Sequence, residues 1–120
     1  RKIVLFQGAR NQAELYNREL FEALDRDHDN FTYVPALSQA EGDADWSGYQ
    51  GYVHEAAKEH FDGRFAGNKA YLCGPPPMID AAITALMQGR LFERDIFMEK
   101  FLTAADGAEE TQRSALFKKI

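Results

Sequence analysis

The sequence is most informative at Tyr71-Leu72-Cys73-Gly74-Pro75-Pro76-Pro77-Met78-Ile79-Asp80, where an apolar run meets the only cysteine, a glycine and three consecutive prolines. The apolar run from Lys69 to Leu72 predicts a strand, and the apolar spacing after the prolines predicts a helix that begins near Met78 and ends at Gly89. Ligands of open α/β sheets bind outside the carboxyl ends of the strands. The turn therefore predicts a thiol at the ligand-binding edge of such a sheet.

Strand and helix patterns alternate along the rest of the chain. Three further apolar runs predict strands, at Lys2–Gln7, Phe31–Leu37 and Ile96–Phe101. Pro35 cannot donate a ladder hydrogen bond, so its strand is expected at an edge. Helical spacing predicts one helix from Asn11, with Glu14 completing a capping box, and another over Val53–Phe61. Residues 39–51 form a polar loop of a length typical of binding loops, and the alternation as a whole predicts an α/β fold with a mostly parallel sheet.

Composition limits the partners. The chain has 120 residues, a formal net charge of −5 and a pI near 5.1, which argues against nucleic acid because phosphate binding needs clustered Lys and Arg. A single cysteine forms no internal disulfide, and the sequence has neither a long apolar run nor a signal-peptide pattern. We therefore expect a cytoplasmic protein with no membrane partner. His28, His54 and His60 do not have the spacing of a metal site, so no metal ligand is predicted.

Two domains are expected: a partial binding domain over residues 1–102, and a C-terminal extension over 103–120 that is poor in large apolar residues. Because the chain begins with Arg inside a strand pattern, we expect it to be a piece of something longer.

Several motifs together resemble the pyridine-nucleotide lobe of the ferredoxin-NADP reductase superfamily. They are Gly8-Ala9-Arg10 after a strand, Glu14-Leu15-Tyr16, Cys73-Gly74-Pro75-Pro76-Pro77-Met78 and Met98-Glu99-Lys100-Phe101. With the extension 101–107 and the end 113–120, the chain is most similar to the reductase components of multicomponent phenol hydroxylases. The resemblance covers essentially all 120 residues.

The resemblance implies an electron-transfer flavoprotein in which NADH reduces FAD, and a [2Fe-2S] cluster passes electrons to a di-iron hydroxylase. This chain would be the NADH lobe, and its partners would be the flavin and ferredoxin-like domains of the parent reductase and the hydroxylase component. The family's flavin-binding motif and cluster cysteines are absent from this sequence, so the chain itself is expected to bind neither group and to be inactive in isolation.

The resemblance also implies a doubly wound, Rossmann-like sheet that lacks its first strand and its Gly-Gly-x-Gly phosphate loop. The missing strand would lie centrally, between the strand at Lys2 and the strand that ends at Cys73. The Gly48 to Gly51 spacing sits in a loop and does not replace the phosphate loop.

Two residues are expected to act beside the nicotinamide. Cys73 is similar to the family cysteine that lies against the ring, and the alternative is that it is a small buried hydrophobic residue. Glu99 resembles the family's C-terminal glutamate, which orients the complex or relays protons, and the alternative is a solvent-facing strand residue. Phe101 is similar in position to an aromatic residue that covers the flavin, with core packing as the alternative.

The remaining expected contacts are to the coenzyme. Gly74 lets the backbone approach the ligand, Pro75 and Pro76 fix the turn, and the helix near Met78 points its first amides at a polar part of the dinucleotide. Gly8, Ala9 and Arg10 are expected at the adenosine ribose or pyrophosphate, and the alternative for Arg10 is an ion pair with Glu14.

The coenzyme preference is expected to depend on the segment that begins at Ser38. NADPH-selective relatives commonly place Arg or Lys there, whereas this segment offers Glu41 and Asp43, which favours NADH. Two other functions remain open: a nucleotide-binding module without redox turnover, and an interaction fragment whose apolar sheet edge is covered by a partner.

Overall fold

The computed structural model of the chain describes residues 1–100. Its contacts divide it into two compact units, Arg1–Ala57 and the residues from Lys58 onward. Each unit is a parallel sheet with a helix packed on it, and the division falls within helix α2 (Val53–Phe61). Phe101 and the predicted extension 103–120 lie outside the described residues.

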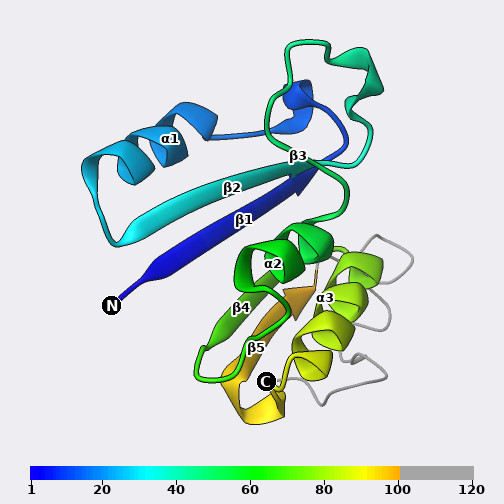
Figure 1. Ribbon diagram of the computed structural model, residues 1–120. Helices are drawn as coiled ribbons and strands as arrows, with labels where there is room; N and C mark the ends of the chain where they lie inside the picture. The colour runs from blue at the N-terminus through cyan, green and yellow to red at the C-terminus, as the bar shows by residue number, and fades with distance from the viewer. Residues whose placement is uncertain (101–120) are drawn as a thin grey trace. The chain divides into compact units, whose positions relative to one another are not determined.

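The first unit contains the three-stranded parallel sheet β1-β2-β3, formed by β1 (Ile3–Ala9), β2 (Phe31–Leu37) and β3 (Tyr49–Gln50). The strands β1 and β2 pair along their whole length, from Ile3 opposite Phe31 to Ala9 opposite Leu37. Helix α1 (Arg18–Asp27) runs beside β2 (Figure 1). The parallel pairing follows from the helical crossover between β1 and β2, because parallel neighbours need a long connection.

A small core closes the carboxyl end of this sheet. Leu37, Ala40 and Trp46 form a buried cluster, against which Ala9 and Leu15 pack. Leu37 is fully buried, and the indole N–H of Trp46 donates to the Tyr49 carbonyl at 3.0 Å. The loop 39–51 is thus held in place by the tryptophan, and it contains a 3₁₀ turn (Ala40–Gly42) and the strand β3, which the sequence did not predict.

The helix predicted from Asn11 was placed wrongly. Residues Gln12–Glu14 form a single 3₁₀ turn, and the α-helix begins only at Arg18, after Asn17 in the left-handed region with φ 53°. The Asn11 side chain makes no capping hydrogen bond, and its Oδ1 is buried without a partner among the described residues. The capping box fails because Arg10 takes the Glu14 carboxylate instead.

The edge position expected for the strand with Pro35 is wrong for the strand as a whole, because β2 lies in the middle of its sheet. However, β3 pairs only with Ala36 and Leu37, so the part of β2 that contains Pro35 has β1 as its only strand neighbour in the described chain. On this stretch the backbone N–H of Tyr33 donates to the Asp25 carboxylate at 2.8 Å. A side chain of α1 therefore satisfies a strand donor that no neighbouring strand reaches.

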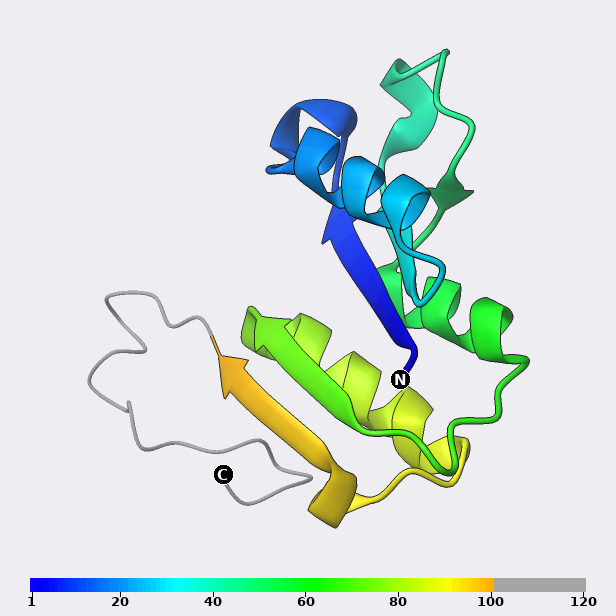
Figure 2. The ribbon, with the colours of Figure 1, turned by 90° about the vertical axis from the view of Figure 1, so that its left-hand side faces the viewer.

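The second unit contains β4 (Ala70–Gly74) and β5 (Ile96–Lys100), which pair in parallel from Ala70 opposite Ile96 to Gly74 opposite Lys100. Helix α3 (Pro76–Gln88) connects them and packs on both strands (Figure 2). Its buried face consists of Ile79, Ala82, Ile83, Ala85 and Leu86. A short 3₁₀ turn at Glu93–Asp95 leads into β5.

Helix α3 ends before Gly89, as predicted, but for a different reason. Gly89 itself has φ −91°, and the left-handed residue is Arg90 with φ 72°. A methyl group at Gly89 would lie 2.6 Å from the Gly63 carbonyl oxygen and would also collide with the Phe65 ring. Glycine is needed here because the loop between α2 and β4, which contains Gly63 and Phe65, packs directly on the Gly89 backbone. The predicted α/β class with parallel strands is confirmed.

Candidate functional site

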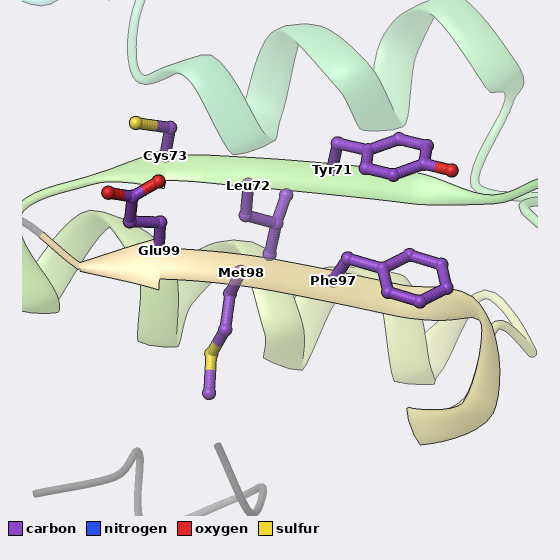
Figure 3. A pocket seen from close by; sticks show the side chains of 6 residues that line it. All are labelled: Tyr71, Leu72, Cys73, Phe97, Met98 and Glu99. Carbon is purple, nitrogen blue, oxygen red and sulfur yellow. The ribbon is translucent and has the colours of Figure 1, made fainter. Parts of the chain in front are cut away.

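Cys73 and Glu99 lie side by side where β4 and β5 end. The two residues are register partners on neighbouring parallel strands, so their side chains leave the sheet on the same face. Figure 3 shows the thiol and the carboxylate next to each other near the carboxyl ends of the strands. Both side chains are exposed. Among the described residues Cys73 is therefore not buried as a small hydrophobic residue, and Glu99 faces solvent, as the alternative for that residue expects.

An aromatic pair continues this face toward the start of the strands. The rings of Tyr71 and Phe97 stack with centroids 5.0 Å apart and planes 16° from parallel, and Tyr71 is 76% exposed. An open depression of about 290 Å³ is lined by Tyr71, Leu72, Cys73, Phe97, Met98 and Glu99. Sequence reasoning missed these aromatic residues, although each lies two positions before a predicted site residue and alternation along a strand places such residues on one face.

The turn after Cys73 is tightly built. Gly74 is buried, and a methyl group there would lie 2.9 Å from the sulfur at the flexible end of the Met78 side chain, which would have to move aside. Pro75 is the N-cap of α3, and the next two prolines occupy its first two positions. Proline suits these positions because its fixed φ matches the helix and no N–H is needed there.

The same prolines limit the helix end as a binding site. Pro76 and Pro77 have no backbone N–H, and the N–H of Ile79 donates to the Pro75 carbonyl at 3.1 Å. The N–H of Met78 is thus the first amide that this helix end can offer to a ligand. The expected array of several amides is reduced to a single donor near Gly74.

A second group of predicted residues meets at the carboxyl ends of β1 and β2. Gly8 and Ala9 pair with Ala36 and Leu37, and the backbone N–H of Ser38 donates to the Ala9 carbonyl at 2.9 Å. A methyl group at Gly8 would lie 3.1 Å from the Val53 Cβ, so glycine allows α2 to begin close to the strand. The structure thus brings Gly8, Ala9, Arg10 and Ser38 together within the first unit.

Arg10 forms an ion pair with Glu14 at this edge, the alternative that the sequence left open. The Arg10 Nε donates to both carboxylate oxygens, at 3.1 and 2.9 Å, and the Nη2 also donates to Oε2. The backbone N–H of Arg10 donates to the same carboxylate at 3.0 Å. These hydrogen bonds lower the pKa of Glu14 and raise that of Arg10, with the pair's Coulomb attraction acting in the same direction.

The residues of the second unit suit one end of a pyridine dinucleotide. A flat ring with a carboxamide requires an open apolar surface, a close backbone and a hydrogen-bond acceptor. The depression, the turn at Gly74 and the Glu99 carboxylate supply these three features. Within residues 1–100, no cluster of three or more His, Cys, Asp or Glu could hold a metal ion, and no helix is long and apolar enough to cross a membrane.

Residues 1–84 match the family described as "Oxidoreductase NAD-binding domain". The chain belongs to this family. The chain is 75% identical, over all 120 residues, to "Phenol 2-monooxygenase, reductase component DmpP" of Pseudomonas sp. (strain CF600), of which it covers 34%. It is 62% identical to "Phenol hydroxylase P5 protein" of Acinetobacter pittii (strain PHEA-2), again over 120 residues and 34% of that protein. The resemblance to the reductase components of phenol hydroxylases is confirmed.

A solved structure supports the same fold. The cytochrome P450 reductase GcoB of Amycolatopsis matches with a TM-score of 0.75 and 33% identity, over 84% of this chain and 29% of that one. The chain thus spans about a third of the length of these relatives.

Proposed function

We propose that this chain is the NADH-binding part of a flavin and iron–sulfur reductase that delivers electrons to an aromatic monooxygenase, in the first place a phenol hydroxylase. The placement of Cys73 opposite Glu99 on an open face at the carboxyl ends of β4 and β5 is the observation that carries the proposal. The names of the two phenol-oxidising relatives support the hydroxylase as the partner.

When bound, NADH supplies a hydride, and the protein's task is to orient the ring and exclude water. The polarizable Cys73 thiol would lie against the ring without competing for the hydride. The Glu99 carboxylate would accept a hydrogen bond from the carboxamide of the coenzyme and so fix which face of the ring is presented. Gly74 and the first amide of α3 would bring the backbone close to the ligand.

The adenosine half of the coenzyme would lie at the edge formed by Gly8, Ala9, Arg10 and Ser38, since the carboxyl ends of parallel strands are where such ligands bind. FAD and the [2Fe-2S] cluster would belong to other domains of the parent protein, which together with the hydroxylase component are the proposed partners. Phe101 would cover the flavin. The proposed location of the protein is the cytoplasm, because it needs NADH.

The test uses the full-length protein that contains this segment. Anaerobic mixing with NADH should bleach the flavin absorbance, and amide shifts on titration with NAD⁺ should concentrate at Arg10 and Ser38 and at Cys73 and Glu99. Shifts confined to other residues, or a flavin that NADH does not reduce, would contradict the proposal. Reduction by NADPH at the same rate would contradict the proposed coenzyme.

A further inference from the structure

The edge where β1 and β2 end is rigidly built around Arg10. Beyond the last ladder pair, the backbone N–H of Ser38 donates to the Ala9 carbonyl and that of Gln39 donates to the Arg10 carbonyl, at 2.9 and 2.8 Å. The backbone of Arg10 is therefore fixed relative to the segment that follows β2. Its side chain is 65% exposed, so a ligand at this edge can reach it.

The charge of Arg10 is nevertheless already neutralised. Glu14 accepts hydrogen bonds from the guanidinium and from the backbone N–H of the same residue. A carboxylate that holds both groups of one arginine restricts its guanidinium to one orientation and supplies a counter-ion at contact distance.

The neighbouring cation at this end of the unit is engaged as well. Arg18 donates to Glu22 at 3.2 Å and to the Gln12 side-chain oxygen at 2.8 Å, and its guanidinium lies 5.3 Å from the centre of the Trp46 ring. Gln12 in turn donates from its backbone to Asp43 and from its side chain to Asp45, both at 2.9 Å. The carboxylates of Asp43 and Asp45, in the loop after β2, thus hold the 3₁₀ turn Gln12–Glu14 through hydrogen bonds. Asp43 therefore has a structural role besides any repulsion of a phosphate.

NADP differs from NAD only by the 2′-phosphate on the adenosine ribose, and a site accepts that dianion when it offers an unpaired cation. We propose that Glu14 is a specificity-determining residue: by pairing with Arg10 it occupies an exposed cation that could otherwise bind a 2′-phosphate at this edge, and so makes the site select NADH. The inference rests on the proposed function, since it concerns the same coenzyme. It differs from the sequence interpretation, in which Glu41 and Asp43 supply the selectivity.

The test measures binding without turnover. Adenosine 2′,5′-bisphosphate and 5′-AMP are titrated calorimetrically into the full-length protein, into E14Q and E14A, and into the double variant R10Q/E14Q. Both single variants should bind adenosine 2′,5′-bisphosphate about tenfold more tightly than the wild type, because a charge-assisted hydrogen bond to the freed guanidinium becomes available. Affinity for 5′-AMP should change by less than about twofold, and the gain should shrink at high salt.

E22Q is the matched control, because Glu22 forms the same i,i+4 ion pair with Arg18 and its substitution removes the same charge. Its ratio of the two affinities should equal that of the wild type, and R10Q/E14Q should lose the gain. An unchanged ratio in both E14Q and E14A, with 5′-AMP still bound, would overturn the inference and leave the proposed function standing. Failure of the wild type to bind 5′-AMP, NAD⁺ and NADH would overturn both.

Discussion

Cys73 and Glu99 are opposite each other in the register of β4 and β5, and both side chains face solvent. Ordinary packing does not require this arrangement, because the opposite face of the same strands carries the buried Ile96. A thiol and a carboxylate on the exposed face are therefore available to a ligand.

Replacing Glu99 should slow reduction of the flavin by NADH more than it weakens coenzyme binding. We expect E99Q in the full-length protein to lower the limiting rate about tenfold, since misorientation of a reacting ring by about 1 Å can cost a factor of about 100. Anaerobic stopped-flow measurement separates the limiting rate from the dissociation constant. E93Q removes an exposed carboxylate from the same unit and should behave as the wild type. Equal rates in E99Q and the wild type would refute a role for Glu99.

The hydrogen bond between Tyr33 and Gln7 should be important for the stability of the first unit. The Tyr33 hydroxyl donates to the Gln7 side-chain oxygen at 2.5 Å, and both residues are buried. Y33F leaves that oxygen without its donor, so we expect the free energy of unfolding to fall by about 1–3 kcal/mol. Urea denaturation, monitored by the fluorescence of Trp46, the single tryptophan of these 120 residues, measures this loss. The control Y16F alters a tyrosine that is 65% exposed and should change stability little.

Because of Tyr33, the stability of the first unit should also fall at alkaline pH. Burial raises the pKa of the Tyr33 phenol, an effect that the Arg18 charge partly offsets. Because the folded pKa lies above the unfolded value of about 10, the stabilising contribution is complete below about pH 10 and is lost as the pH rises through the folded pKa. Between pH 9 and the folded pKa, wild type should lose stability more steeply than Y33F, and parallel curves would show that Tyr33 does not titrate in this way.

Gly89 should tolerate no side chain. In G89A the new methyl group would collide with the Gly63 carbonyl oxygen and the Phe65 ring. The loop that contains these two residues cannot move away without breaking the hydrogen bond from the Phe65 N–H to the Gly89 carbonyl. We expect a loss of about 1–3 kcal/mol, typical of overpacking, measured by hydrogen exchange of the α3 and β4 amides. G42A is the control, because no atom lies within 4 Å of the position of its new methyl group. Equal protection in both variants would show that the contact is not tight.

Glu14 should titrate at a lower pH than an ordinary glutamate. Its lowered folded pKa means that the contribution of the ion pair is present above the unfolded value of about 4.3 and is lost as the pH falls through the folded pKa. Carbon-detected NMR should give a titration midpoint for the Glu14 carboxyl below about pH 4.3 in the wild type, and R10Q should raise this midpoint. R94Q, which breaks a pair in the second unit, should leave the midpoint unchanged. It follows that Glu14 stays ionised, and coenzyme preference stays constant, between pH 6 and 8.

The sequence by itself determined the alternation of strands and helices, the strand-to-helix turn at Cys73 and the family, because these depend on short-range periodicity and on motifs whose residues are close in the chain. Only the tertiary structure decided which residues face each other. Cys73 opposite Glu99 and Tyr33 against Gln7 depend on the register of strands that come from distant parts of the chain. The helix predicted at Asn11 was wrong for a related reason: Glu14 fits a capping box locally, but its carboxylate is held more strongly by the Arg10 cation at the end of β1.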